Sequence, residues 1–267
     1  MVFDFKKAFQ QKLDDKVHDY AISGMVAQDG TVYPLGSDTK VLSTIFELFT
    51  RPFMLEIAAE NGLQLIEPIA QNHYPDFTLC SDRGAMGKIA VDVKTTYVTN
   101  PSDPFGFTLG GYTSFIRDGN GTKNIAFPFH HYAEHWVVGY VYERIAAKQA
   151  AQHATYRLDQ LKKIPLAYQG VRVFVQEKWR IASDKAGSGN TTNIGSIRGR
   201  IDDFLAGNGP FQSEEEFLHY WKNYGTTAAA RLNFKNILGY RDWRVDTAPI
   251  VPVQPATPSS HQRELDE

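Results

Sequence analysis

The sequence has a single cysteine, no long hydrophobic run and no excess of positive charge. Cys80 has no partner for an intramolecular disulfide, and its apolar neighbours predict a buried thiol without a catalytic role. No stretch approaches the roughly 20 apolar residues that cross a bilayer, and the N-terminal residues mix charged and apolar side chains, unlike a signal peptide. We therefore expect a cytoplasmic protein that does not bind a membrane. The net charge of −2 gives no general argument for nucleic-acid binding.

What is present is ordinary globular composition, with 42% hydrophobic and 22% charged residues in a chain of 267. A chain of this length can bury a substantial core in one large domain. Residues 247–267 contain four prolines and no hydrophobic periodicity, which predicts a disordered tail. We therefore expect one domain over residues 1–245 and a proline-rich tail over residues 246–267.

Hydrophobic periodicity and turn residues predict a mixture of helices and strands. The Asp29-Gly30 pair between two β-prone runs predicts a hairpin, because glycine readily takes a positive φ. A long helix should start near Ser37, be kinked by Pro52 and end at Gly62. Further helices are expected within residues 1–20, over residues 129–149 and from Ser213, where Glu216 completes a capping box, and strands over residues 63–67, 76–80, 88–98 and 171–183. This pattern predicts an α/β fold with a central mixed sheet flanked by helices.

Pro75-Asp76 and Asp92-Val93-Lys94 form a pattern typical of metal-dependent nucleases. Side chains alternate along a strand, so Asp92 and Lys94 project to one side, where a neighbouring strand can bring Asp76. Two carboxylates, with the carbonyl of Val93, suit the octahedral oxygen coordination of Mg²⁺. The metal would activate a water and polarise the phosphate, and Lys94 would orient or help deprotonate that water and stabilise developing charge. The spacing alone would also allow Asp92 and Lys94 to be a surface-facing ion pair on an edge strand.

His131, Glu134 and His135 form a competing motif on the predicted helix over residues 129–149. Histidines four residues apart share one helix face and could bind Zn²⁺, with Glu134 as the general base of a zinc-dependent hydrolase. No downstream residue is marked as a third ligand, and the apolar residues that follow indicate core packing. Histidines with a structural or interface role are the alternative.

The glycine-rich run at residues 186–195 lacks the Gly-Lys-Ser/Thr ending of a phosphate-binding loop. It could instead enter the major groove of DNA, since the Asn190 amide fits a bidentate contact with adenine and the Thr191 methyl fits thymine. Gly187 and Gly189 would let the backbone approach the base edges. An ordinary surface turn explains the same composition, so the run by itself leaves both interpretations open.

Four separated stretches, residues 33–49, 71–79, 107–117 and 186–197, resemble the EcoRV family of type II restriction endonucleases, within the PD-(D/E)xK nuclease superfamily. The likeness covers roughly residues 20–244, and the zinc motif lies outside the four stretches. It implies a Mg²⁺-dependent enzyme that acts on double-stranded DNA as a homodimer and cuts GATATC to blunt ends. It also implies a cognate DNA methyltransferase in the host. A catalytically silent DNA-binding protein is the alternative, but it would not need an intact catalytic constellation.

The same resemblance implies roles for individual residues. Asp76 and Asp92 would bind the metal, Lys94 would be the catalytic lysine, and Glu47 would add an acidic group near the metal that spacing alone does not select. The implied base-reading residues are Gly187, Ser188, Gly189, Asn190 and Thr191 in the major groove and Asn72 in the minor groove. The implied contacts to the DNA backbone, or their supports, are Thr39, Gln71, Thr95, Thr96, Tyr97 and Ser114. Ala70 and Arg198 depart from the family's pattern, whereas the metal constellation does not.

Overall fold

The computed structural model describes residues 3–15, 20–36, 38–110, 112–145, 154–187, 193–225 and 234–247. Its strands are β1 (Gly24–Val26), β2 (Thr31–Pro34), β3 (Gln64–Ile66), β4 (Phe77–Cys80), β5 (Lys88–Val98), β6 (Tyr132–Arg144), β7 (Tyr156–Arg157), β8 (Tyr168–Glu177), β9 (Ala182–Ala186) and β10 (Ile194–Ser196). Its α-helices are α1 (Phe5–Asp14), α2 (Thr39–Glu60), α3 (Tyr112–Arg117), α5 (Lys178–Ile181), α6 (Ile201–Ala206), α7 (Glu214–Asn223) and α8 (Ile237–Thr247). Two 3-10 segments are η1 (Phe129–His131) and η2 (Leu158–Lys163).

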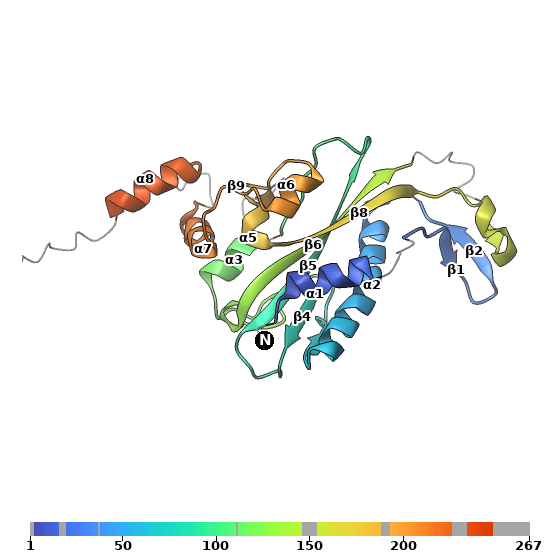
Figure 1. Ribbon diagram of the computed structural model, residues 1–267, viewed down its shortest axis with the longest axis horizontal. Helices are drawn as coiled ribbons and strands as arrows, with labels where there is room; N and C mark the ends of the chain where they lie inside the picture. Colours follow the sequence, from blue (N-terminus) through green and yellow to red (C-terminus); the bar gives the residue numbers. More distant parts are fainter. Residues whose placement is uncertain are drawn as a thin grey trace, which may run out of the picture.

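A five-stranded mixed sheet in the order β3-β4-β5-β6-β8 forms the centre of the molecule (Figure 1). The strands β3, β4 and β5 pair antiparallel, β5 and β6 run parallel, and β6 and β8 pair antiparallel. The strand β5 therefore lies in the middle, as its apolar sequence predicts. The expected α/β fold with a central mixed sheet and flanking helices is confirmed.

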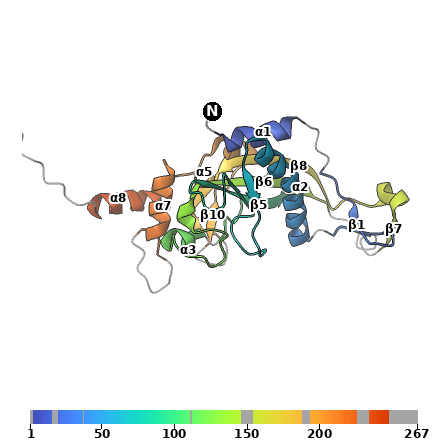
Figure 2. The same cartoon turned by 90° about the horizontal axis from the view of Figure 1, so that it is seen from below.

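Helices cover both faces of this sheet. On one face, α1 and α2 share a core with the sheet that includes Phe46 and Val91. On the other face, α3, α6 and α7 share a second core with it that includes Val141 and Phe204. In Figure 1, α3, α6 and α7 gather at the end of the sheet away from β1 and β2, and Figure 2 shows α3 and α7 at the opposite end from β1 and β7. Because side chains alternate along a strand, successive residues of β5 face the first core and the second core in turn.

The strands β1, β2 and β7 form a separate three-stranded sheet at the far end of the molecule (Figure 1). The turn between β1 and β2 contains Gly30, whose φ is 83°. The side chain of Asp29 accepts the backbone N–H of Thr31 at 2.9 Å. The predicted hairpin is confirmed, and its strands leave the large apolar side chains of Met25 and Tyr33 exposed.

The predicted helix over residues 129–149 is wrong. The short η1 leads directly into β6, which pairs with β5 on one side and β8 on the other, and residues 146–149 lie outside the described residues. From His135 to Tyr142 every residue of β6 is buried. Its apolar side chains therefore form a continuous run instead of the alternation of a half-buried strand. That run, with two histidines four residues apart, imitates a helical pattern.

Other predicted elements are confirmed, with small shifts at their ends. The helix α2 contains Pro52 and begins after Asp38, whose side chain caps the first turn. Gly62 follows the end of α2 with a φ of 65°. Ser213 caps α7 by accepting the backbone N–H of Glu216 at 3.1 Å. Local capping and turn chemistry thus fixes the limits of these helices.

Four further expectations have mixed outcomes. Cys80 is buried with a free thiol, as predicted. Residues 171–183, expected as strands, are divided between β8, α5 and β9. Residues 248–267 of the expected tail lie outside the described residues. In the part of the chain that the structure describes, no helix is both long and apolar enough to cross a membrane.

Phe46 anchors α2 to the sheet, because its fully buried ring stacks on Tyr140 at a centroid distance of 4.7 Å. The Phe46→Ala change should lower the free energy of unfolding by about 3–5 kcal/mol, since the removed ring leaves a cavity. Leu48→Ala, on an exposed position of the same helix, is the matched control and should cost less than about 1 kcal/mol. Urea unfolding measures both values. Equal losses would show that Phe46 does not anchor the helix.

Candidate active site

The candidate site lies where β4 separates from β5. The two strands pair as far as Phe77 opposite Val91, and the same register, if continued, would bring Asp76 opposite Asp92 and then Pro75 opposite Val93. Pro75 has no N–H to donate to a ladder. The backbone N–H of Val93 donates instead to Asp76 Oδ2 at 2.7 Å. The separation of the two strands thus carries the Asp76 carboxylate to the edge of the central strand.

Asp92 and Lys94 complete the predicted constellation. They lie two residues apart on β5 and project to the same side, and Lys94 Nζ lies 2.8 Å from Asp92 Oδ1. Lys94 also donates to the carbonyl of Val93 at 3.2 Å. The charges of Asp92 and Lys94 both act on Asp76. The structure therefore brings together the four residues that the sequence pattern selects.

A second lysine, which no sequence motif selects, contacts the same carboxylate. Lys178 Nζ donates to Asp92 Oδ2 at 3.0 Å, and the lysine side chain is 1% exposed. The ammonium group lies 4.2 Å from the ring centroid of Tyr74 and 4.4 Å from that of Tyr112. Each oxygen of Asp92 therefore faces one ammonium group.

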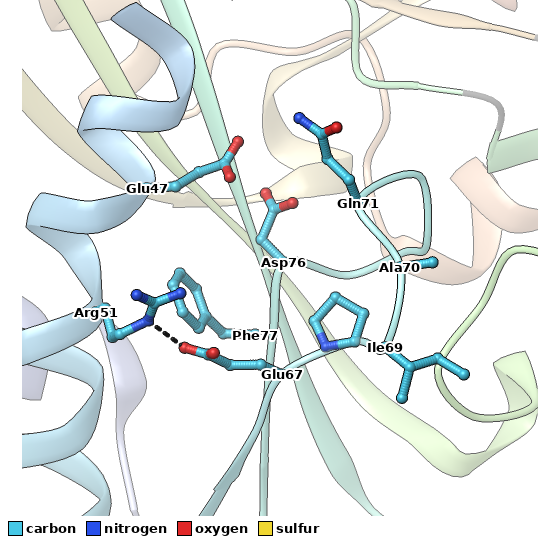
Figure 3. Close-up of a pocket in the computed structure, with 9 residues that line it drawn as sticks. Glu47, Arg51, Glu67, Ile69, Ala70, Gln71, Asp76 and Phe77 are labelled. Carbon is cyan, nitrogen blue, oxygen red and sulfur yellow. Dashed lines mark hydrogen bonds and ion pairs between the residues drawn. The ribbon is translucent and has the colours of Figure 1, made fainter. Parts of the chain in front are cut away.

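Glu47 reaches the site from α2 (Figure 3). Its carboxylate points toward that of Asp76, and both residues line a pocket between α2 and the chain segment that precedes β4. Arg51 and Glu67 form an ion pair at 2.5 Å on another part of the wall. Gln71 extends from the loop on the opposite side (Figure 3). The resemblance to known nucleases, rather than any local pattern, identified Glu47, and the structure places it beside the constellation.

Burial and like charges shift the ionisation of these acids. Burial raises the pKa of Asp76 to about 7, and the charges of Asp92 and Glu47 reinforce this shift. Burial also raises the pKa of Glu47. Burial opposes the ionisation of Asp92 as well, but Lys178 and Lys94 outweigh it and lower its pKa to about 2. Asp92 is therefore an anion at neutral pH, whereas Asp76 exchanges a proton there.

The two lysines are both cations at neutral pH. Burial lowers the pKa of Lys178 to about 8, against the attraction of Asp92. Burial also disfavours the charge of Lys94, but the attraction of Asp92 and Asp76 outweighs it and raises the pKa of Lys94. Lys94 therefore presents a positive charge to any anion that enters the site.

The donor atoms of the site fit a hard divalent cation. Carboxylate oxygens of Asp76 and Asp92, with the carbonyl of Val93, the residue after Asp92, are the ligands that Mg²⁺ prefers. The raised pKa of Asp76 reflects burial first and repulsion from Asp92 second, and a cation would relieve the repulsion. Within the described ranges, no three histidine, cysteine or acidic side chains already form a set of metal ligands. A cation would therefore take its remaining ligands from water and substrate.

The interpretation of His131, Glu134 and His135 as a helical zinc site is wrong. His131 ends the short η1 and His135 lies on β6, so the two histidines do not share the face of one helix. His135 is buried, and its Nδ1 lies 2.8 Å from the hydroxyl of Tyr74. Glu134 accepts a hydrogen bond from Trp136 Nε1 at 2.7 Å. His135 thus supports Tyr74, in the loop that leads to Asp76.

The residues selected for DNA contacts lie on several elements around the site. The exposed ones are Thr39, Gln71, Asn72, Tyr97 and Ser114, and the half-buried ones are Thr95 and Thr96. Thr95, Thr96 and Tyr97 directly follow Lys94 on β5. A DNA backbone that crosses the end of β5 would therefore meet them beside the acidic pocket.

The glycine-rich run connects β9 to β10, which pair antiparallel. The backbone N–H of Gly187 donates to the carbonyl of Asn193 at 2.7 Å, which closes the hairpin at its last described residues. Ser188, Gly189, Asn190 and Thr191 lie outside the described residues. Of the two departures from the family pattern, Ala70 lines the pocket beside Gln71, whereas Arg198 is exposed after β10.

Comparison with known proteins identifies chains similar to this one. The sequence model of the family described as restriction endonuclease EcoRV matches residues 16–245. The type II restriction enzyme EcoRV of Escherichia coli is 53% identical over 232 residues, which are 86% of this chain and 94% of that enzyme. The matched range includes the candidate site and the β9–β10 hairpin.

The pKa of Asp76 predicts how the metal-free protein responds to pH. In the unfolded chain an aspartate has a pKa of about 4. The folded state therefore holds the proton of Asp76 more tightly than the unfolded state does. Ionisation of Asp76 between about pH 4 and about pH 7 consequently favours unfolding. The Asp76→Asn variant lacks this charge beside Asp92 and Glu47. Its stability advantage over the unchanged protein should therefore grow by about 1–4 kcal/mol between about pH 5 and about pH 8. Urea unfolding in a chelator measures it, and a pH-independent difference would contradict the assignment.

Proposed function

This chain belongs to the EcoRV family of restriction endonucleases, and from that premise we propose that it cleaves GATATC to blunt ends in a Mg²⁺-dependent reaction. It is a type II restriction endonuclease that acts on double-stranded DNA. One observation carries the proposal for its chemistry: Asp76, Asp92 and Lys94 meet at the fork between β4 and β5. A DNA-binding protein without catalysis would not need two repelling carboxylates in a half-buried site.

Enzymes of this family depend on a divalent cation, and we assign it as Mg²⁺ because the donors are hard oxygens. Asp76 and Asp92 would hold it, with the Val93 carbonyl as a third ligand and Glu47 as a further acid at the pocket wall. When bound, the cation polarises the scissile phosphate and lowers the pKa of a coordinated water. Asp76 must release its proton to contribute a charged ligand, which links metal binding to pH.

Lys94 would act on the phosphate as a cation. Its ammonium group is held by Asp92 Oδ1 and the Val93 carbonyl, at the side of the site that remains partly exposed. The raised pKa of Lys94 keeps it charged, which favours stabilising negative charge at phosphorus over removing a proton from water. The same group can donate a hydrogen bond that orients the attacking water.

Sequence recognition is assigned to the loop between β9 and β10 and to the loop before β4. Asn190 and Thr191 have the chemistry to read A and T in the major groove, with Gly187, Ser188 and Gly189 allowing close approach. Asn72 would reach the minor groove from the loop beside the catalytic acids. The proposed contacts to the DNA backbone, or their supports, are Thr39, Gln71, Thr95, Thr96, Tyr97 and Ser114.

A palindromic site calls for a two-fold symmetric enzyme, so we propose a homodimer. The small sheet supports this, because Met25, Val26 and Tyr33 expose apolar surface on it, and η2 beside it exposes Leu158 and Leu161. A second copy would cover such a surface. Host DNA that contains the same site needs protection, so a cognate methyltransferase is expected. The cytoplasmic location and the single domain over residues 1–245, with a tail over residues 246–267, stay predictions.

Digestion of phage DNA by the purified chain tests the function directly. With Mg²⁺ we expect discrete fragments whose sequenced ends are blunt and fall at the centre of GATATC, and with chelator we expect none. Cleavage at another sequence would overturn the specificity, and tight binding with no cleavage under any divalent cation would support the non-catalytic alternative.

Asp92→Asn and Lys94→Ala should each lower the single-turnover cleavage rate by about 10²-fold or more, because each removes charge from the reacting centre. Both variants should stay folded and bind duplex DNA in chelator, but Asp92→Asn should lose stability because it leaves the buried Lys178 without its counter-charge, so rates are compared per folded molecule. Asp82→Asn, in the exposed turn between β4 and β5, is the matched control and should cleave at the rate of the unchanged enzyme. An unchanged cleavage rate for either Asp92→Asn or Lys94→Ala would contradict the assignment of that residue to the catalytic site.

Asn190→Ala should lower cleavage at GATATC by several orders of magnitude, because a bidentate contact to adenine contributes about 1–3 kcal/mol and a dimer makes it twice. Non-specific, salt-sensitive binding should change little, because phosphate contacts elsewhere carry it. Asn61→Ala, at the exposed end of α2, is a control that should leave both measurements unchanged. Unaltered plasmid cleavage by Asn190→Ala would rule out base reading by that residue.

A further inference from the structure

Lys178 is a buried charged residue outside the sequence motif of the active site. It directly follows β8, which is separated from β5 by β6 in the sheet. Asp92, Val137 and Gln176 are aligned across these three strands. Lys178, two residues beyond Gln176, must therefore extend along the sheet face past β6 to reach Asp92 Oδ2 at 3.0 Å. A long flexible side chain is needed to span that gap.

The surroundings of Lys178 show that its charge has a specific partner. A buried ammonium group is costly unless it is paired, and this side chain is 1% exposed. The rings of Tyr74 and Tyr112 lie on the ammonium group and attract it through their π-electrons. Among the described residues, Asp92 is the carboxylate within ion-pair distance of it. The enclosure fixes the ammonium group and thereby fixes the carboxylate oxygen that it contacts.

The two lysines hold different oxygens of Asp92 and differ in access. Lys94 contacts Oδ1 and its side chain is 22% exposed, whereas Lys178 contacts Oδ2 from the closed side. Oδ1 is thus the oxygen on the side that solvent and substrate can approach. A cation entering there would compete with Lys94, while the contact of Lys178 with Oδ2 would persist.

The two rings around Lys178 come from segments with proposed DNA contacts. Tyr74 lies in the loop that contains Gln71 and Asn72, and its hydroxyl is held by His135. Tyr112 is the first residue of α3, the helix that contains Ser114. Lys178 therefore touches both of these segments and the central carboxylate.

We propose that Lys178 is a positioning residue that anchors Asp92 Oδ2, leaves Oδ1 for the divalent cation and ties this carboxylate to the two DNA-facing segments. The proposal rests on the proposed Mg²⁺-dependent nuclease function. The lysine itself does not touch the substrate, and its effect passes through the orientation of Asp92.

Lys178→Met keeps the length and apolar stem of the side chain but removes the ammonium group. We expect the single-turnover cleavage rate at saturating Mg²⁺ to fall by about 10–100-fold, the usual effect of losing a group that orients a metal ligand. The DNA concentration at half-saturation should change by less than about threefold, because phosphate and base contacts are unaltered. Mn²⁺, which binds such ligands more tightly than Mg²⁺ in general, should restore part of the rate.

Lys88→Met is the matched control. Lys88 is also fully buried, donates to the carbonyl of Ala85 and lies over the ring of Phe127, but it is the first residue of β5, six residues before Lys94. Its loss should lower stability while leaving the rate per folded molecule and the metal dependence unchanged. Equal effects of both changes on cleavage would reduce Lys178 to a structural residue and overturn the proposal.

Other outcomes are equally decisive. If Lys178→Met binds Mg²⁺ more tightly and cleaves at the unchanged rate, the lysine only opposes the metal's charge and positions nothing. If Lys178→Met does not fold, the double variant Asp92→Asn with Lys178→Met decides: recovery of the melting temperature supports the pairing, and additive loss contradicts it. Failure of the unchanged enzyme to cleave in Mg²⁺ would instead reject the proposed function, independently of Lys178.

Discussion

Two carboxylates that repel each other, Asp76 and Asp92, meet in a half-buried fork, and much of the surrounding structure serves to keep them there. The backbone N–H of Val93 holds one, and Lys94 and Lys178 hold the other. Two ammonium groups balance the negative charges of the two carboxylates, so the site can form before a metal binds. Asp76 can still take up or release a proton near neutral pH. It is therefore the carboxylate of the pair whose charge varies with pH.

The sheet determines which residues can take part in this arrangement. The strand β5 has a neighbour on each side and a helical layer over each face, so the position of Asp92 is fixed from four directions. Residues with proposed DNA contacts lie mostly on loops, helix ends and the far part of β5. The proposed reaction therefore takes place on the most constrained strand, and the proposed recognition depends mostly on loops and helix ends, which tolerate sequence change better than a core does.

Local signals predicted much of this structure, and the failures have physical causes. The hairpin at Gly30, the limits of α2 and three strands follow from turn residues and periodicity. The strand β6 was predicted as a helix because burial on both faces removes the alternation that marks a strand. Lys178 was missed because a lysine after a strand normally faces solvent, and its contact with Asp92 depends on a strand order that no local pattern encodes.

The hydrogen bond between Gly187 and Asn193 has a consequence for how such enzymes diversify. It ties together the two ends of the segment at residues 188–192, so the geometry of the hairpin below does not depend on which side chains the segment carries. If the segment reads bases as proposed, replacing a few of its residues would change the target sequence while the residues of the catalytic site on β5 stay the same.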